Sequence, residues 1–144
     1  MNKILHIILI PLFSLTVISC AKKSSTSSSS TTTDNTTTSG AVTTLAGTGS
    51  SGSANGTGTS ASISQPYEIT TDGTNLYVAE YGNYLIRQIV ISTGVVTTVA
   101  GTGFSGSANG TGTSANFYNP WGITTDGINL YVADRDNHQI RQIE

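Results

Sequence analysis

Hydrophobic and polar positions divide the chain into three unlike parts. Residues 4–18 are almost entirely apolar, residues 24–40 contain no apolar side chain, and beyond them short apolar runs alternate with Gly-, Asn- and Ser-rich turns. Runs of four to seven residues rich in β-branched and aromatic side chains are typical of strands. Because no segment after the first apolar stretch shows the 3.6-residue period of an amphipathic helix, the pattern predicts an all-β domain over residues 41–144.

The apolar runs also predict the order of the strands. One unit is expected to contain four antiparallel strands, at residues 67–71, 76–79, 85–91 and 95–100. Three more strands are expected between Trp121 and Ile143, after a Gly/Ser-rich crossover at Gly101–Asn119. Val42–Ala46 repeats the sequence of the fourth strand, so we expect it to be a strand as well, able to complete the last unit by strand exchange.

The region after Gly40 is one unit written almost twice, so that residue 42 corresponds to residue 96 and residue 69 to residue 123 (period 54). Ile69–Ala79, for example, returns as Ile123–Ala133 with one difference. When residues 41–90 are aligned on 95–144, 34 of the 50 positions are identical. A fixed period near 40–50 residues is typical of propeller blades and solenoid repeats. Four short antiparallel strands and a crossover in each period favour a propeller blade.

The repeat resembles a known family at specific residues. The segments Asn119–Asp126 and Asn129–Arg141 contain Pro-x-Gly-Ile, an Asp, Asn-x-Tyr-Val-Ala-Asp and Asn-His-x-Ile-Arg, and are therefore similar to an NHL repeat. The first copy departs from this pattern at Glu68, Glu80 and Tyr84. The resemblance implies two four-stranded antiparallel blades of a partial β-propeller. Propellers of this family typically have six blades and bind proteins, RNA or small ligands, and a minority support lyase chemistry.

The N-terminal part is expected to be an export signal, residues 1–19, because Lys3 precedes an apolar run too short for a comfortable membrane span. Its end, Val17-Ile-Ser-Cys20, resembles the lipobox of bacterial lipoproteins. That resemblance implies a lipid such as palmitate on Cys20 and a membrane-anchored protein of the bacterial cell envelope. The absence of an acidic residue at Ala21 favours the outer membrane. A secreted protein with an incidental cysteine is the alternative, and Pro11 argues against an uncleaved anchor.

Residues 20–40 are expected to be a lipidated cysteine followed by a flexible tether. A segment of Ser, Thr, Asn and Asp cannot bury enough surface to offset its conformational entropy. As a flexible coil, its 17 Ser/Thr-rich residues would span roughly 20–25 Å. A glycosylated stalk is an alternative that the composition leaves open.

Charge and cysteine content exclude several classes of function. The net charge is −2 and only 10% of residues are charged, against about 25% in ordinary globular chains. There is consequently no basic field to hold nucleic acid. The single Cys excludes a disulfide within the chain and a multi-cysteine metal site.

Two blades are too few for a closed propeller, which takes about four to eight. Alone, they would expose apolar sheet faces. Three copies around a threefold axis would give six blades, so a homo-trimer is one expectation. A fragment of a longer propeller is the other, because the sequence stops at Glu144, where a turn like Ile91–Gly94 would be expected to follow.

Two acidic–basic pairs recur seven residues apart on adjacent expected strands. Glu80 and Arg87 in the first copy correspond to Asp134 and Arg141 in the second. We interpret them as structural ion pairs between neighbouring strands. An arginine that faces a ligand at the ring centre is the alternative.

Other candidate residues have structural interpretations beside functional ones. Asp72 and Asp126 precede Gly in expected turns, where their side chains can accept hydrogen bonds from the backbone; a metal-binding ring of aspartates is the alternative. His138 is the only His beyond the signal, and a single imidazole lacks the further ligands that zinc requires. We therefore expect no metal site.

Aromatic residues and glycines add two further candidates. Tyr67, Tyr118 and Trp121 lie at the mouths of first strands, where core packing competes with ligand stacking. Gly47–Gly52 and Gly101–Gly106 both fit G-x-G-x-x-G, but the residues that follow cannot open the helix that a dinucleotide site needs. We interpret them as crossover loops and expect no cofactor.

These observations together predict a non-enzymatic, lipid-anchored module of the bacterial envelope. Its expected partners are the membrane, copies of itself, and an unknown protein or small-molecule ligand. The alternatives are a propeller enzyme of the lyase or lactonase type, active only as an oligomer or within a longer chain, and a fragment without independent function. No catalytic residue is predicted.

Overall fold

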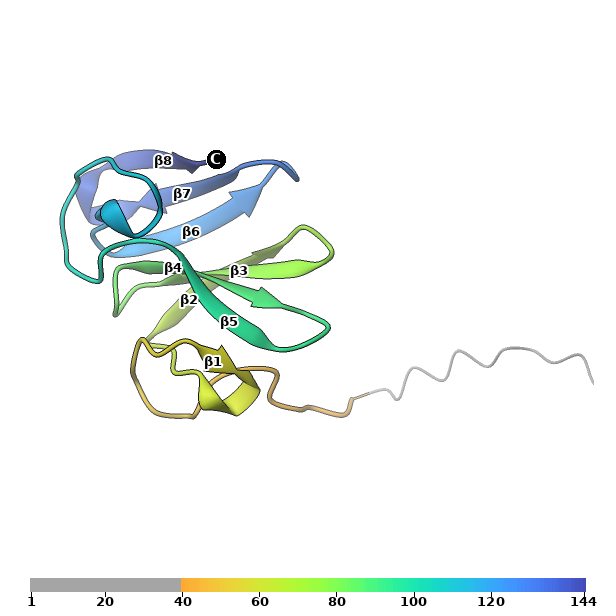
Figure 1. The fold of residues 1–144 in the computed structure, drawn as a ribbon. Helices are drawn as coiled ribbons and strands as arrows, with labels where there is room; N and C mark the ends of the chain where they lie inside the picture. The colour runs from red at the N-terminus through yellow and green to blue at the C-terminus, as the bar shows by residue number, and fades with distance from the viewer. Residues whose placement is uncertain (1–39) are drawn as a thin grey trace, which may run out of the picture. The chain divides into compact units, whose positions relative to one another are not determined.

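The computed structural model describes residues 40–144; the predicted signal peptide, Cys20 and nearly all of the tether lie outside the described residues. The described part is all-β, with two antiparallel sheets and short 3₁₀ turns (Figure 1). The elements in chain order are β1 (Gly56–Thr57), η1 (Gly58–Ser60), β2 (Pro66–Thr71), β3 (Asn75–Glu80), β4 (Leu85–Val90), β5 (Val95–Ala100), η2 (Gly112–Ser114), β6 (Pro120–Thr125), β7 (Leu130–Asp134), η3 (Arg135–Asn137) and β8 (Gln139–Ile143).

The first sheet is a four-stranded meander with one short extra strand. Its order is β1-β5-β4-β3-β2, so each of the four predicted strands pairs with the next along the chain. The ladder runs through Ile69, Val78, Arg87 and Thr98, which lie opposite one another. Chains of short hairpins with this order form the blade of a β-propeller.

The second sheet repeats the first three strands of that meander in the order β6-β7-β8. Ile123, Val132 and Arg141 face one another across it, which is the register of the first sheet displaced by one period. A register shift follows the first residue of both leading strands, Pro66 and Pro120. The repeat in the sequence is therefore a repeat in the backbone.

The turns follow from residues that accept unusual backbone angles. Gly73 and Gly127 have φ of +90° and +91° at the equivalent hairpin turns, an angle that costs glycine little. In the next hairpin of each copy the left-handed position is held by Tyr84 and His138, with φ of 58° and 56°. The two copies thus turn in the same way even where their side chains differ.

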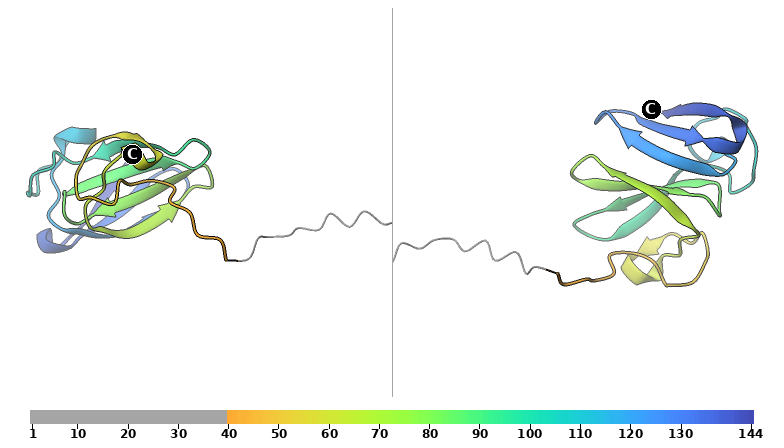
Figure 2. Two further views of the ribbon diagram at one scale, coloured as in Figure 1. Left: turned by 90° about the horizontal axis from the view of Figure 1, so that it is seen from below. Right: turned by 180° about the vertical axis from the view of Figure 1, so that it is seen from behind.

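Two hydrophobic clusters hold the described part together, one on each face of the first sheet. The larger lies between the two sheets, with the crossover residues Ala115 and Phe117 packed among residues of both. The smaller joins the other face of the first sheet to the preceding crossover, through residues that include Ala61. Val78 and Ala79 belong to different clusters because adjacent residues of a strand point to opposite faces. Figure 2 shows the resulting layers, with the first sheet between the N-terminal crossover and the second sheet.

One predicted strand is wrong. Residues 42–46 are not a strand and do not complete the second sheet. Instead, Gly56 and Thr57 pair with the outer edge of β5. The physical reason is that a fourth strand needs a third strand beside it, and the third strand with a free edge, β8, belongs to the second sheet, which the first sheet separates from the N-terminal crossover. The sheets therefore have five and three strands.

Candidate functional site

Aromatic side chains from both sheets meet at one end of the leading strands. Tyr67 is the second residue of β2, Trp121 is the second residue of β6, and Tyr81 lies in the turn between β3 and β4. The ring centroids of Tyr67 and Trp121 are 3.6 Å apart, and Tyr81 meets Trp121 edge-on at 6.3 Å. Tyr67 is 50% exposed and Trp121 37% exposed. These rings are therefore shared between packing and solvent rather than enclosed in the core.

An arginine completes this group. The Arg135 guanidinium carbon lies 4.6 Å from the centroid of the Trp121 ring, a distance at which a cation is attracted to the face of an indole. Arg135 is more than half exposed, and its Nε is 3.6 Å from the Asp136 carboxylate. We call Tyr67, Tyr81, Trp121 and Arg135 the aromatic–arginine cluster.

A shallow hollow of about 430 Å³ adjoins the cluster on the second sheet. Trp121, Arg135, His138 and Ile140 are among its lining residues. Its walls therefore combine apolar carbon with a cationic side chain and an imidazole. This is the combination of an apolar surface and a few polar groups that small-molecule sites present.

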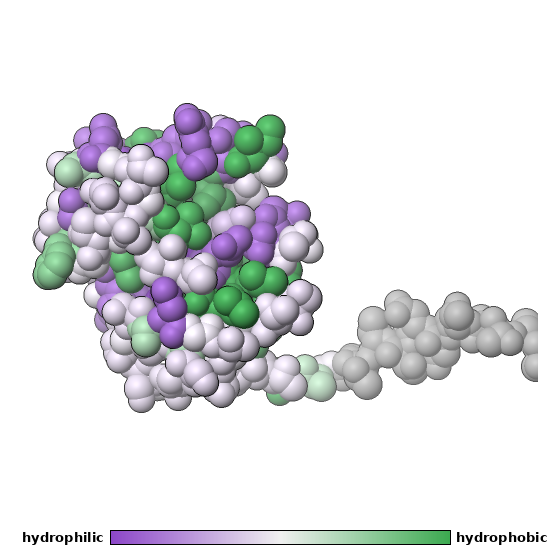
Figure 3. Space-filling model, viewed as in Figure 1, coloured by the Kyte–Doolittle hydropathy of each residue, from purple (hydrophilic) through white to green (hydrophobic). Residues whose placement is uncertain are grey.

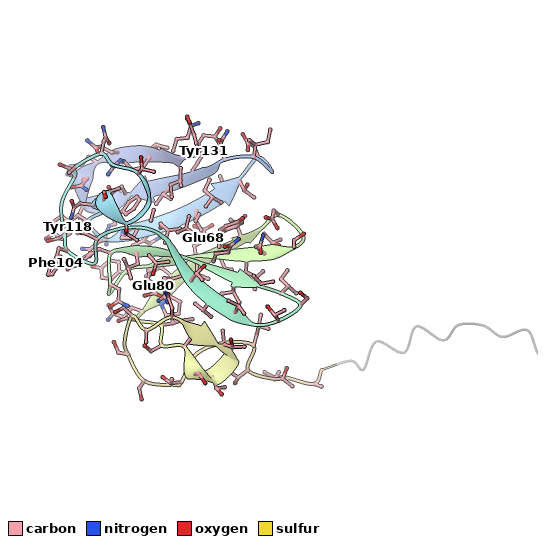
Figure 4. The ribbon with its side chains drawn as sticks, in the orientation of Figure 1. Glu68, Glu80, Phe104, Tyr118 and Tyr131 are labelled. Atoms are coloured by element: carbon pink, nitrogen blue, oxygen red, sulfur yellow. The ribbon has the colours of Figure 1, made fainter. Side chains whose placement is uncertain are left out.

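The third predicted aromatic residue does not join this cluster. Tyr118 lies edge-on to Tyr84, with ring centroids 6.0 Å apart. Figure 4 shows it at the crossover end of the sheets, the end that also carries Phe104, which is 76% exposed. Tyr118 and Trp121 thus both lie near the start of β6, but their rings contact different aromatic side chains.

The structure brings together both predicted ion pairs. Glu80 and Arg87 are 2.8 Å apart, and neither side chain has any exposed surface. Asp134 and Arg141 are 2.9 Å apart, with Arg141 10% exposed. Burial raises the pKa of the Glu80 carboxyl above its ordinary value, while a hydrogen bond from Asn83 and the Arg87 guanidinium oppose that shift.

These arginines fasten the crossovers to the sheets. Arg87 donates hydrogen bonds to the carbonyl oxygens of Ala54 and Ser62 and to the side chain of Asn55. Arg141 makes the same three contacts with the equivalent residues of the second copy. A guanidinium whose two terminal nitrogens donate to backbone carbonyls, an Asn side chain and a carboxylate is not free for a ligand; the Arg87 Nε, which has no partner within residues 40–144, is buried. The arrangement favours the structural interpretation of both pairs.

The two turn aspartates also accept hydrogen bonds from their own loops. The Asp126 carboxylate accepts from the backbone N–H groups of Ile128 and Asn129 and from the Tyr131 hydroxyl. These bonds lower the pKa of Asp126 to about 2, the Asn129 backbone contributing most. Asp72 is held in the same way, and its pKa is lowered chiefly by Asn75. Residues 40–144 contain no group of three or more His, Cys, Asp or Glu side chains placed to hold a metal ion.

Two members of the cluster were missed by sequence reasoning. Tyr81 and Arg135 occupy the same position in the two copies of the repeat, but the NHL pattern leaves this position variable. From the sequence, Glu68 is marked only by its difference from Gly122, its equivalent in the second copy. Its carboxylate crosses to the second sheet and accepts a hydrogen bond from the backbone N–H of Ile123, at 3.2 Å. The signal that marks all three is a difference between copies at one end of the blade.

Helical structure in the described part is limited to single 3₁₀ turns. Within residues 40–144, no helix is long and apolar enough to cross a bilayer.

The comparisons with known proteins agree with this repeat. The sequence model of the NHL repeat matches residues 117–143. NHL repeat-containing protein 2 of Bos taurus is 37% identical over 98 residues, which cover 65% of this chain and 14% of that protein. This chain therefore spans only a small part of the curated relative that it matches.

Solved structures give the same result. An auxiliary nutrient binding protein from Bacteroides ovatus matches with a TM-score of 0.59 and 28% identity, over 66% of this chain and 26% of that one. A protein from Bacteroides thetaiotaomicron, whose name suggests a phosphatase, matches with a TM-score of 0.61 and 24% identity, over 70% of this chain and 26% of its own. At that identity the second likeness shows the fold alone. The chain thus carries an NHL repeat, within two propeller blades that leave the ring open.

Proposed function

We propose that this chain is a non-enzymatic binding module of the bacterial cell envelope, held at the membrane by a lipid on Cys20. Its ligand contact is the aromatic–arginine cluster beside the hollow on the second sheet. The observation that carries the proposal is the close, tilted contact of the partly exposed Tyr67 and Trp121 rings, with Arg135 against the indole. The likeness to an auxiliary nutrient binding protein supports a small nutrient as the ligand.

The chemistry of the cluster limits the class of ligand. Aromatic rings offer apolar faces that bury much area at little entropic cost. Arg135 adds a fixed positive charge with several donors. A small organic molecule with one flat apolar face and a polar or anionic edge fits both features.

Trp121 allows a direct test, because it is the only tryptophan in the chain. The full chain would be titrated with monosaccharides, disaccharides, nucleosides and amino acids while its indole fluorescence is recorded. A saturable change with at least one of these compounds is expected, with affinity at least tenfold weaker in Tyr67→Ala and Arg135→Ala. Phe104→Ala is the matched control, because Phe104 is an exposed aromatic residue outside the cluster. Unchanged affinity in both cluster variants would overturn the site.

The anchor is tested separately. The full chain expressed in a bacterium with labelled palmitate should incorporate the label and enter the detergent phase on phase separation. Cys20→Ser should lose both properties. Equal labelling of the variant and the natural chain would contradict the proposed anchor while leaving the ligand site untouched.

A further inference from the structure

The two outer faces of the blade pair carry the same apolar positions that meet between the blades. Ile86 is fully buried between the sheets, whereas Ile140, its equivalent on the second sheet, is 75% exposed. In the opposite direction, Ile123 is 4% exposed, whereas Ile69, its equivalent on the first sheet, is 55% exposed. Figure 3 shows that hydrophobic residues also reach the surface over the region between the two sheets. Each outer face is thus a half of an interface that the chain already forms internally.

The edge of β8 lacks a partner strand within the described residues. In the first sheet the corresponding edge, that of β4, pairs with β5. A cavity of about 530 Å³ lies beside β8, between Arg141 and Ile143 on one side and Asn109 and Gly112 on the other. In the first sheet, β5 lies between β4 and β1 (Gly56–Thr57). Residues 110–111 are the equivalent of β1 in the second copy, so the fourth strand of the second sheet would lie between β8 and these residues, in this cavity.

The chain also carries a fourth strand without a sheet. Val42-Thr-Thr-Leu-Ala46 repeats Val96–Ala100 with one difference, yet it is not paired as a strand. Val42 is 95% exposed and Leu45 41% exposed. Gly40, before this segment, has φ of +95°, and its equivalent before β5, Gly94, has φ of +70°. The backbone therefore enters the unpaired segment through the same left-handed glycine that leads into β5.

We propose that copies of this chain associate head to tail through these elements. Residues 42–46 of one copy pair with β8 of a neighbouring copy and become the fourth strand of its second sheet. The first sheet of the copy that donates this strand then packs on the open face of that second sheet. The register follows from the first sheet, where Ile89 pairs with Val96 and Arg87 with Thr98. Displaced by one period, Val42 of one copy faces Ile143 of the other, and Thr44 faces Arg141. The occupant is a second copy because seven of the eight buried residues of the larger cluster recur at the equivalent outer positions, the exception being Phe117, whose equivalent is Ile63.

The open face of the first sheet has room for this contact. A groove of about 460 Å³ runs along it, lined by residues that include Leu45, Ile69 and Leu76. In the internal interface, the equivalents Ile123 and Leu130 belong to the larger hydrophobic cluster, and Val99 packs against it. Ile140 of the neighbouring copy would enter this groove in the same way that its equivalent, Ile86, packs between the two sheets of one copy.

The contact is heterologous, so it can be repeated until a ring closes. Each copy adds two blades, and propellers close with about four to eight. Two to four copies therefore complete a ring, and three would give the six blades implied by the NHL resemblance. The inference does not depend on the ligand site. Because Trp121 and Ile140 also line the hollow, the association would place Tyr67 of the next copy beside Trp121 and cover that hollow.

Blocking the two faces separately tests the direction of the contact. Ile69→Glu places a charge on the open face of the first sheet, and Ile140→Glu places one on that of the second. Each full chain, purified in detergent, should lose the assembled species in native mass spectrometry. Mixed together, the two variants should form a species of one copy of each, because each retains the face that the other lacks. Ile128→Glu is the control, since Ile128 is 87% exposed in a hairpin turn outside both faces, and it should assemble like the natural chain.

Either of two results would overturn the proposal. One is a natural chain that stays monomeric at every concentration; the other is a mixture that yields no mixed pair although circular dichroism shows both variants folded. A pair formed by one variant alone would indicate a symmetric contact and would equally contradict the head-to-tail arrangement.

The donated strand has its own test. Replacing both Thr43 and Thr44 with Pro removes two successive backbone donors, one of which must face β8 in any pairing. The doubly substituted chain should remain folded, because this segment is unpaired in the isolated structure, and should lose the assembled species. Assembly equal to that of the natural chain would show that residues 42–46 are not the missing strand.

Discussion

The two blades share most of their sequence but not their surroundings. Comparing them separates the effect of a residue's identity on its burial from the effect of the neighbouring blade. Ile86 and Ile140 are the same residue at the same place in the repeat, one fully buried and the other 75% exposed. The ion pair is fully enclosed in the first blade, while Arg141 keeps 10% of its surface in the second. In a repeat architecture, burial comes from adjacent units. Each residue buried between the blades can therefore be compared with its exposed equivalent in the other blade.

The largest contrast is expected at the arginines. Arg87→Met leaves the Glu80 carboxylate in the core without its partner, which should cost about 3–5 kcal/mol in the free energy of unfolding. Arg141→Met should cost less, about 1–3 kcal/mol, because Arg141 already keeps 10% of its surface exposed and its removal lets water approach the buried Asp134 carboxylate. Denaturant unfolding of both variants and the natural chain measures this difference. Equal losses would mean that the open face of the second blade does not admit water.

A second contrast concerns the isoleucines. Ile86→Ala removes side-chain carbon from the cluster between the blades and should cost about 2–5 kcal/mol. Ile140→Ala should change stability by only about 0.5 kcal/mol in dilute solution, as exposed positions do. Thermal unfolding at low concentration checks both values.

Protein concentration should affect Ile86→Ala and Ile140→Ala differently. If copies associate, the cost of Ile140→Ala should grow as concentration rises, because the residue becomes buried in the assembly. The cost of Ile86→Ala should stay nearly constant. A concentration-independent difference at both positions would argue against burial of Ile140.

The smallest effect is expected at the hairpin turns, where the two copies behave alike. The pKa of Asp126 is lowered to about 2 by hydrogen bonds to its carboxylate. Its contribution to stability is therefore present above the unfolded value near 3.8 and is lost as pH falls toward 2. The difference in Tm between the natural chain and Asp126→Asn should shrink over that interval, as it should for Asp72→Asn. A difference that is constant from pH 6 to pH 2 would show that the carboxylate charge is not involved.

Strands and repeats could be predicted from the sequence because they depend on local pattern. The hairpin turns at Asp72 and Asp126 and the apolar runs between them determine the meander. The state of Val42–Ala46 could not be predicted in this way. Its sequence is that of a strand, but pairing depends on a third strand that the described part of the chain does not place beside it.

The candidate site was predictable only in part, for a related reason. Trp121 and Tyr67 stand out as aromatic residues at strand starts, and their contact follows from the packing of successive blades. Arg135 lies in a turn whose residues vary between copies, and this difference is the only mark that the sequence gives it. Its place over the indole depends on how the chain turns between β7 and β8.

The central claim is that two blades with open, complementary faces are a unit that completes itself with its own copies. The mass of the full chain in detergent solution, measured by light scattering with the detergent contribution subtracted, tests this most directly. The account predicts two, three or four times the mass of one chain, independent of further increase in concentration. A mass equal to one chain throughout, for protein with β-sheet circular dichroism, would contradict it.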